Sequence, residues 1–176
     1  MAQGNIFADG SFDDAAQDGA QRSRVSVAHY SADEVIGQFL ALYHCLDFKA
    51  ELADIGIGRF QFSRRKKALR KFRVLAVALW GLALQKSFPG DAQDFFNEFR
   101  TRIADVAGTG KAPERFVNRL NIYVDLLAPK KDGDFLPVTE YLSDVLALNA
   151  DDFRRLRLKL SLIIRNLYVL IFDRLV

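Results

Sequence analysis

The chain has 176 residues, of which 50% are hydrophobic and 27% are charged, and its formal net charge is +3. This composition predicts one folded domain and excludes a chain that is disordered throughout. The net charge is too small to indicate a partner, so the position of the charges matters more than their sum. The single cysteine, Cys45, excludes an intramolecular disulfide and fits a reducing compartment.

Residues 1–28 are rich in Gly, Asp, Ala, Gln and Ser, and their few apolar residues follow no period. We expect them to form a largely disordered tail, with residues 29–176 as the folded domain. A segment for secretion or partner recognition is the alternative. The tail lacks the basic start and apolar stretch of a secretory signal. The longest uncharged apolar run covers only residues 74–84, whereas a membrane span needs about 20 residues, so we expect a cytoplasmic protein.

Helix signals follow one another from Ser31 onward. Ser31 and Glu34 have the spacing of a capping box, and apolar residues recur behind them at intervals of three and four up to Gly56. Pro113 and Pro137 stand where first-turn prolines are favoured. These signals predict six helices, over approximately residues 31–55, 60–88, 91–107, 113–128, 137–146 and 149–176. Since strand-like alternation and internal repeats are both missing, we predict an all-α fold, a single-domain helical bundle.

The predicted helix over residues 60–88 changes character along its length. One face is apolar throughout, and its members are Phe62, Leu69, Phe72, Ala76, Leu79 and Trp80. The opposite side is cationic up to Arg73 and apolar from Val74 to Leu84. Because a helix that is apolar all round belongs inside a bundle, we expect a long, partly buried central helix whose first turns protrude. Gly81 in its second half indicates a close helix crossing.

The protruding turns form the main candidate binding surface, which we call the basic face. Its members are Arg64, Lys66, Lys67, Arg70, Lys71 and Arg73. Cations along about 15 Å of helix could neutralise the phosphates of a nucleic acid or bind an anionic membrane. The alternative is a solvated face, partly paired with acidic residues of the next helix, namely Asp91, Asp94 and Glu98. The nearby aromatic residues are expected to be core, so any nucleic-acid binding would be backbone-directed and non-specific; these are Phe60, Phe62 and Phe72.

The last helix has two apolar stripes on nearly opposite sides. The main stripe contains Phe153, Leu156, Leu160, Ile163, Ile164, Leu167 and Ile171. The second contains Leu158, Leu162, Val169 and Val176. Since monomers rarely expose a long apolar strip, we expect the second stripe to meet another helix of the same chain or to form a self-interface with a second copy. A second basic cluster begins this helix and would enlarge the basic face if it lay at the same end of the bundle; it contains Arg154, Arg155, Arg157 and Lys159.

No motif predicts catalysis, a metal or a cofactor. His44, Asp47 and Glu51 share a helix face, but they lack the further His and Cys of a zinc site and the Glu-x-x-His pairs of a di-metal site. Cys45 is not expected to be a nucleophile, because its neighbour His44 points about 100° away and cannot serve as its base. We expect a buried free cysteine, which is the common case. The run GTGK at residues 108–111 lacks the first glycine and the final Ser or Thr of a phosphate loop.

The sequence therefore favours a non-enzymatic interaction protein, self-associating as a homodimer or acting as a subunit of an assembly. The alternative is a module that binds nucleic acid or an anionic surface through the basic face. An enzyme with a site built only from carboxylates is a third hypothesis, since clustered acids cannot be recognised from this sequence.

Overall fold

A computed structural model describes residues 30–108, 110–128, 134–148 and 153–175, and all the regular structure in these residues is helical. This confirms the all-α prediction. The helices are α1 (Ala32–Cys45), α2 (Lys49–Asp54), α3 (Phe62–Ser87), α4 (Ala92–Thr101), α5 (Ile103–Ala107), α6 (Ala112–Leu127), α7 (Leu136–Val145) and α8 (Phe153–Asp173). Two short helices, α2 and α5, are additional to the six that were expected. The predicted tail and the start of the last helix at residues 149–152 lie outside the described residues.

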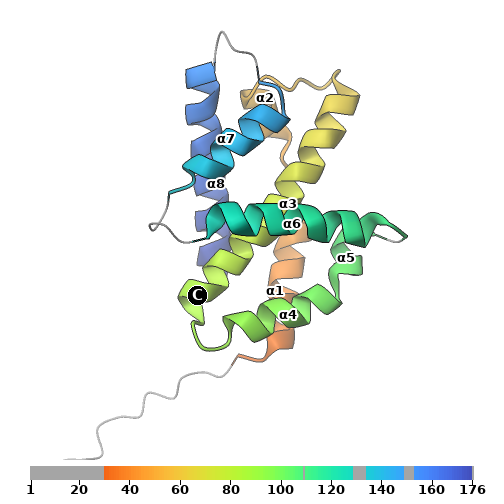
Figure 1. Ribbon diagram of the computed structural model, residues 1–176, viewed down its shortest axis with the longest axis vertical. Coiled ribbons are helices and arrows are strands. Elements are labelled where there is room, and N and C mark those ends of the chain that lie inside the picture. The colour runs from red at the N-terminus through yellow and green to blue at the C-terminus, as the bar shows by residue number, and fades with distance from the viewer. Residues whose placement is uncertain (1–29, 109, 129–133, 149–152, 176) are drawn as a thin grey trace, which may run out of the picture. The chain divides into compact units, whose positions relative to one another are not determined.

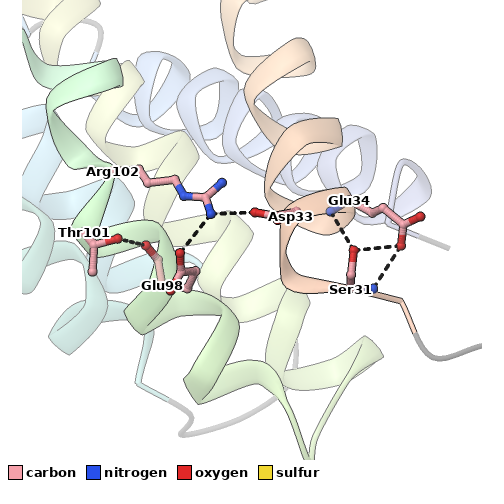
Figure 2. A network of polar contacts seen from close by, with 6 residues as sticks. All are labelled: Ser31, Asp33, Glu34, Glu98, Thr101 and Arg102. Atoms are coloured by element: carbon pink, nitrogen blue, oxygen red, sulfur yellow. Dashed lines mark hydrogen bonds and ion pairs between the residues drawn. The ribbon is translucent and has the colours of Figure 1, made fainter.

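The start of α1 confirms the capping box. The Glu34 N–H donates to Ser31 Oγ at 3.3 Å, and the Ser31 N–H donates to Glu34 Oε2 at 3.0 Å (Figure 2). These two bonds satisfy backbone donors that a helix start leaves free. The pKa of Glu34 is lowered because both Ser31 groups donate to its carboxylate. The sequence signal therefore gave the first helix boundary correctly.

The first predicted helix ends earlier than expected. Leu46 is extended, with φ −66° and ψ 115°, and α2 begins after a short break. The Asp47 carboxylate accepts from the Lys49 N–H at 3.2 Å, which supports the new helix start. Gly56 ends α2 with φ +79°, and the Ile57 N–H bonds to the Leu52 carbonyl at 2.7 Å. This is the left-handed glycine ending that the sequence indicated, but it closes α2 rather than one long helix.

A similar break separates α4 from α5 at Arg102. Its guanidinium forms ion pairs with Asp33 at 2.5 Å and with Glu98 at 2.9 Å, which link the first turn of α1 to the last turn of α4 (Figure 2). These two carboxylates raise the pKa of Arg102. Asp91 precedes α4 as expected, but its side chain makes no capping hydrogen bond.

The helix α3 is the long central helix of the domain, and it packs against α6, α8, α4 and α1 (Figure 1). Its second half is buried, as predicted. Trp80 is fully buried and stacks on Phe39 of α1 with ring centroids 4.4 Å apart. A Cβ atom at Gly81 would lie 2.9 Å from Cε2 of Phe96, so the glycine allows α4 to approach α3 closely. Core packing thus fixes the central helix, including the basic turns that precede its buried part.

Candidate anion-binding site

The structure divides the six residues of the basic face into two groups. Two of them are half-buried and bind α7. Arg64 Nη2 donates to the carbonyl oxygens of Leu146 at 3.1 Å and Ala147 at 2.9 Å, beyond the last turn of α7. Lys71 Nζ donates to Tyr141 Oη at 3.4 Å and lies 5.3 Å from the centroid of that ring. Arg64 and Lys71 therefore hold α7 and the residues after it against α3. The sequence suggested that both side chains are free to bind a ligand, but they are engaged in these contacts.

The other four residues of the basic face are exposed: Lys66, Lys67, Arg70 and Arg73. Within the described ranges, none of them forms a hydrogen bond or an ion pair. The expectation that Asp91, Asp94 and Glu98 pair with this face is wrong, because Glu98 pairs with Arg102 and no described ion pair joins the basic face to the other two. These four cations are solvated and available.

Arg70 and Arg73 line a cavity of about 390 Å³ together with Lys111, which immediately precedes α6, and two arginines of α6. We call this cavity the basic pocket and define it by Arg70, Arg73, Lys111, Arg115 and Arg119. Its apolar wall contains Val74, Val106, Ala107, Ala112 and Phe116, and Tyr43 of α1 also lines it. No carboxylate belongs to this lining in the part of the chain that the structure describes. The pocket therefore concentrates positive charge that no described acidic residue neutralises.

The geometry of α6 explains why Arg115 and Arg119 point the same way as Lys111, the residue that precedes the helix. Lys111, Arg115 and Arg119 are spaced by four residues, so they follow one stripe of the helix. The inward face of α6 is formed by other residues, namely Phe116, Leu120, Tyr123 and Leu127. Lys111 and Ala112 bring the first turn of α6 to the pocket. Free backbone N–H groups at a helix start favour a bound anion and add to the charge of the side chains.

Tyr43 forms part of the wall of the pocket. Its side chain is buried, and its hydroxyl has no hydrogen-bond partner among the described residues. Burial raises the pKa of Tyr43, while the nearby Arg73 cation acts in the opposite direction. Because the hydroxyl oxygen itself is buried, Tyr43 forms the wall of the pocket on the side of α1 and does not offer that oxygen to a ligand.

Two aromatic residues, one just before α3 and one at its first position, do not lie where the sequence placed them. Phe60 is 76% exposed and Phe62 is 75% exposed, whereas Phe72 is buried as expected. The Arg59 guanidinium lies 4.9 Å from the centroid of the Phe60 ring. Helical periodicity aligned Phe62 correctly with the apolar face, but no described helix covers that face at the first turn. The prediction that Phe60 and Phe62 are core residues is therefore wrong.

The second apolar stripe of α8 is exposed. Leu158 is 63% exposed, Leu162 is 50% exposed and Val169 is 46% exposed. The main stripe faces the core, with Leu160, Ile164, Leu167 and Ile171 buried. Packing of the second stripe within the chain, one of the two expectations, is thus wrong for these three residues, and the fourth member, Val176, lies outside the described residues. The possibility of a self-interface stays a prediction.

The basic start of α8 lies at the same end of the domain as the basic start of α3 (Figure 1). Only Arg154 and Arg155 are exposed there. Arg157 pairs with Glu140, and Lys159 Nζ donates to the carbonyl oxygen of Asp54 at 3.1 Å. This cluster therefore adds two free cations rather than four.

The residues that sequence analysis weighed for metal or thiol chemistry lie apart from the basic pocket. His44 and Cys45 are both exposed, so the expectation of a buried cysteine is wrong. Asp47 pairs with Lys49 at 2.6 Å. Within the described ranges, no group of three or more His, Cys, Asp or Glu residues is placed to hold a metal ion.

Comparisons with protein-family models, with curated proteins and with solved structures find no match for this chain. None of the helices described here is long and apolar enough to cross a membrane. The basic pocket missed by sequence analysis had one visible signal, the four-residue spacing of Lys111, Arg115 and Arg119. The stripe alone does not predict a pocket, because the pocket forms only where α6 lies beside α3.

Proposed function

We propose that the protein is a non-enzymatic binding protein that holds the phosphate backbone of a nucleic acid in the basic pocket. The observation that carries this proposal is the convergence of five cations, from α3, from α6 and from the residue before α6, on one cavity whose described lining contains no carboxylate. Like charges placed together destabilise a folded protein unless a ligand or counter-ions neutralise them. Arginine is well suited to phosphate, because its planar guanidinium can donate two parallel hydrogen bonds.

A polymer fits this surface better than a single small anion. Lys66 and Lys67 continue the cationic surface along α3 before it reaches Arg70 and Arg73. From Lys66 to Arg73 the helix rises by about 10 Å. A ligand with phosphates at regular intervals can contact the pocket and these lysines at the same time. Such contacts give affinity without reading the base sequence.

The test is a salt series with a fluorescently labelled oligonucleotide, in which binding is followed by anisotropy. Affinity should fall steeply as salt rises, because each neutralised phosphate releases counter-ions. The double variant Arg73→Gln with Arg115→Gln should lower affinity and reduce the salt slope by about two, since two phosphate contacts are lost.

A matched control separates the pocket from total charge. The double variant Arg100→Gln with Arg174→Gln removes the same charge from two exposed positions outside the pocket. It should leave the salt slope unchanged. Equal losses in the two double variants would contradict the proposal, because binding would then follow net charge and not the pocket.

A second function, self-association through α8, is favoured by the exposure of Leu158, Leu162 and Val169. Leu158 and Val169 are almost equally distant from the middle of α8, so an antiparallel two-fold pairing would place each nearly opposite the other. Burial of these side chains between two copies would remove apolar surface from water.

The solution mass tests this second function. Light scattering on a sizing column should give twice the chain mass of 19.9 kDa. Leu162→Glu should give the monomer mass, because it places a charge in the centre of the stripe. Ile122→Glu, at an exposed apolar residue of α6, is the control and should leave the dimer intact. A monomeric wild-type protein at high concentration would contradict self-association.

A further inference from the structure

We infer that Phe60 and Phe62 form a stacking platform for unpaired bases, so that the nucleic acid held by the basic pocket is single-stranded. This inference rests on the proposed function and names its ligand more closely. The starting observation is the unusual exposure of these two rings, at 76% and 75%. Every other phenylalanine side chain that the structure describes is buried or half-buried. The two rings are therefore exceptions within this domain.

The surroundings of the two rings are cationic. The chain has no Asp or Glu from residue 55 to residue 90, a stretch that contains both rings and the whole basic face. The Arg59 guanidinium already lies 4.9 Å from the centroid of the Phe60 ring. A surface that combines exposed aromatic rings with cations matches the chemistry of single strands, because bases stack on the rings while phosphates contact the cations.

The geometry of α3 connects the rings with the basic pocket. Phe62 stands at the edge of the apolar face, where it borders the basic face: at 100° per residue, Phe62, Lys66 and Arg73 fall within about 40° of one another around the helix axis. Phe62 precedes Arg73 by about 16 Å along that axis. The exposed side chain of Lys66 lies between them along the same stripe. A strand whose phosphates pass from the pocket to Lys66 thus brings its bases to the rings.

The platform distinguishes single strands from duplexes for a steric reason. In a duplex the faces of the bases are already stacked inside the helix, and only their edges are open to a protein. In a single strand the faces can turn outward and stack on aromatic side chains. A duplex can still place phosphates in the basic pocket, but it gains nothing from Phe60 and Phe62.

The experiment compares a labelled thymidine oligonucleotide with a hairpin duplex of equal length. Phe60→Ala with Phe62→Ala should weaken single-strand binding by about tenfold or more, and duplex binding by less than twofold. Both rings are exposed, so the substitutions should not disturb the fold. The control Ile122→Ala with Leu170→Ala removes exposed apolar side chains elsewhere and should change neither affinity. Phe62→Trp should keep single-strand binding, and its new indole emission should be quenched by the bases.

The outcomes separate this inference from the proposed function. If Arg73→Gln with Arg115→Gln abolishes binding while the phenylalanine variant changes nothing, the platform is wrong and the phosphate site stands. If neither oligonucleotide binds, the proposed function fails and the platform with it. Vesicles of phosphatidylserine and phosphatidylcholine test the same rings against a membrane. Loss of vesicle binding in the phenylalanine variant, with oligonucleotide binding unchanged, would overturn the inference.

Discussion

The two halves of α3 belong to one continuous helix but have opposite environments. From Val74 to Leu84 every residue except Leu82 is buried, and Trp80 lies fully enclosed among aromatic rings. From Phe62 to Arg73 only Ala68 and Phe72 are buried, and the exposed residues carry the cations. Because the second half is clamped by α6, α8, α4 and α1, it fixes the position of Arg70 and Arg73 in the first half. The comparison shows how a core can hold a charged site in place without belonging to it.

The largest expected effect is in the buried half. Trp80→Ala should lower the free energy of unfolding by about 3–5 kcal/mol, because it leaves a cavity between α1, α3 and α4. Lys67→Ala in the exposed half should change it by less than about 0.5 kcal/mol. Urea unfolding of both variants measures the difference. Similar losses of unfolding free energy in the two variants would contradict this prediction, because the buried half would then contribute no more to stability than the exposed half.

A smaller effect is expected within the exposed half itself. Arg64→Ala should lower the free energy of unfolding by about 1.5 kcal/mol, since its charged guanidinium donates to two carbonyl oxygens beyond α7. Lys66→Ala, two residues away, should have almost no effect because Lys66 is exposed and has no partner among the described residues. Chemical denaturation distinguishes the two. If Arg64→Ala is as neutral as Lys66→Ala, then Arg64 does not anchor α7.

The smallest effect concerns alkaline pH. Burial raises the pKa of Tyr43 above its ordinary value of 10.0, so the folded protein keeps this hydroxyl neutral when the unfolded chain begins to ionise. The resulting stability is complete below pH 10.0 and is lost as the pH rises toward the raised pKa of the folded state. Arg73 opposes the shift, so Arg73→Gln should raise the pKa of Tyr43 further.

Free energies of unfolding measured below and above pH 10.0, together with the absorbance of the phenolate, test whether the pKa of Tyr43 is raised in the folded protein. Tyr43→Phe is the control, and it should weaken the loss of stability without abolishing it, because burial raises the pKa of Tyr123 as well. A Tyr43 hydroxyl that titrates at its ordinary value in the folded protein would contradict the buried position described here.

Local signals in the sequence predicted the fold well where their physics is local. The Ser31 capping box and the first-turn prolines Pro113 and Pro137 all mark observed helix starts. The breaks at Leu46 and Arg102 could not be predicted in the same way, since neither residue is a glycine or a proline. At the second break, the ion pair between Arg102 and Asp33 depends on a residue far away in the sequence.

The candidate site was predictable only in part for a related reason. Periodicity gives the direction of a side chain around its helix, but it does not say what lies in that direction. Phe62 and Phe72 share one face of α3, yet only Phe72 meets other helices. Arg70 and Arg73 were recognised as cations on an exposed face, whereas their association with Arg115 and Arg119 depends on the crossing of α3 and α6. Such a crossing is tertiary information that one sequence does not contain.

The chain has one tryptophan and one cysteine, and the two occupy contrasting places. Trp80 is sealed in the core, so its intrinsic fluorescence follows unfolding and should stay constant when a ligand binds outside. Cys45 is exposed at the end of α1 and lines a separate cavity with residues of α2 and α8. It is two residues after Tyr43, so it points about 200° away from that residue around the helix axis and away from the basic pocket. The wild-type protein thus offers two separate optical reporters, an indole in the core and a thiol for a dye on the surface between α1 and α8.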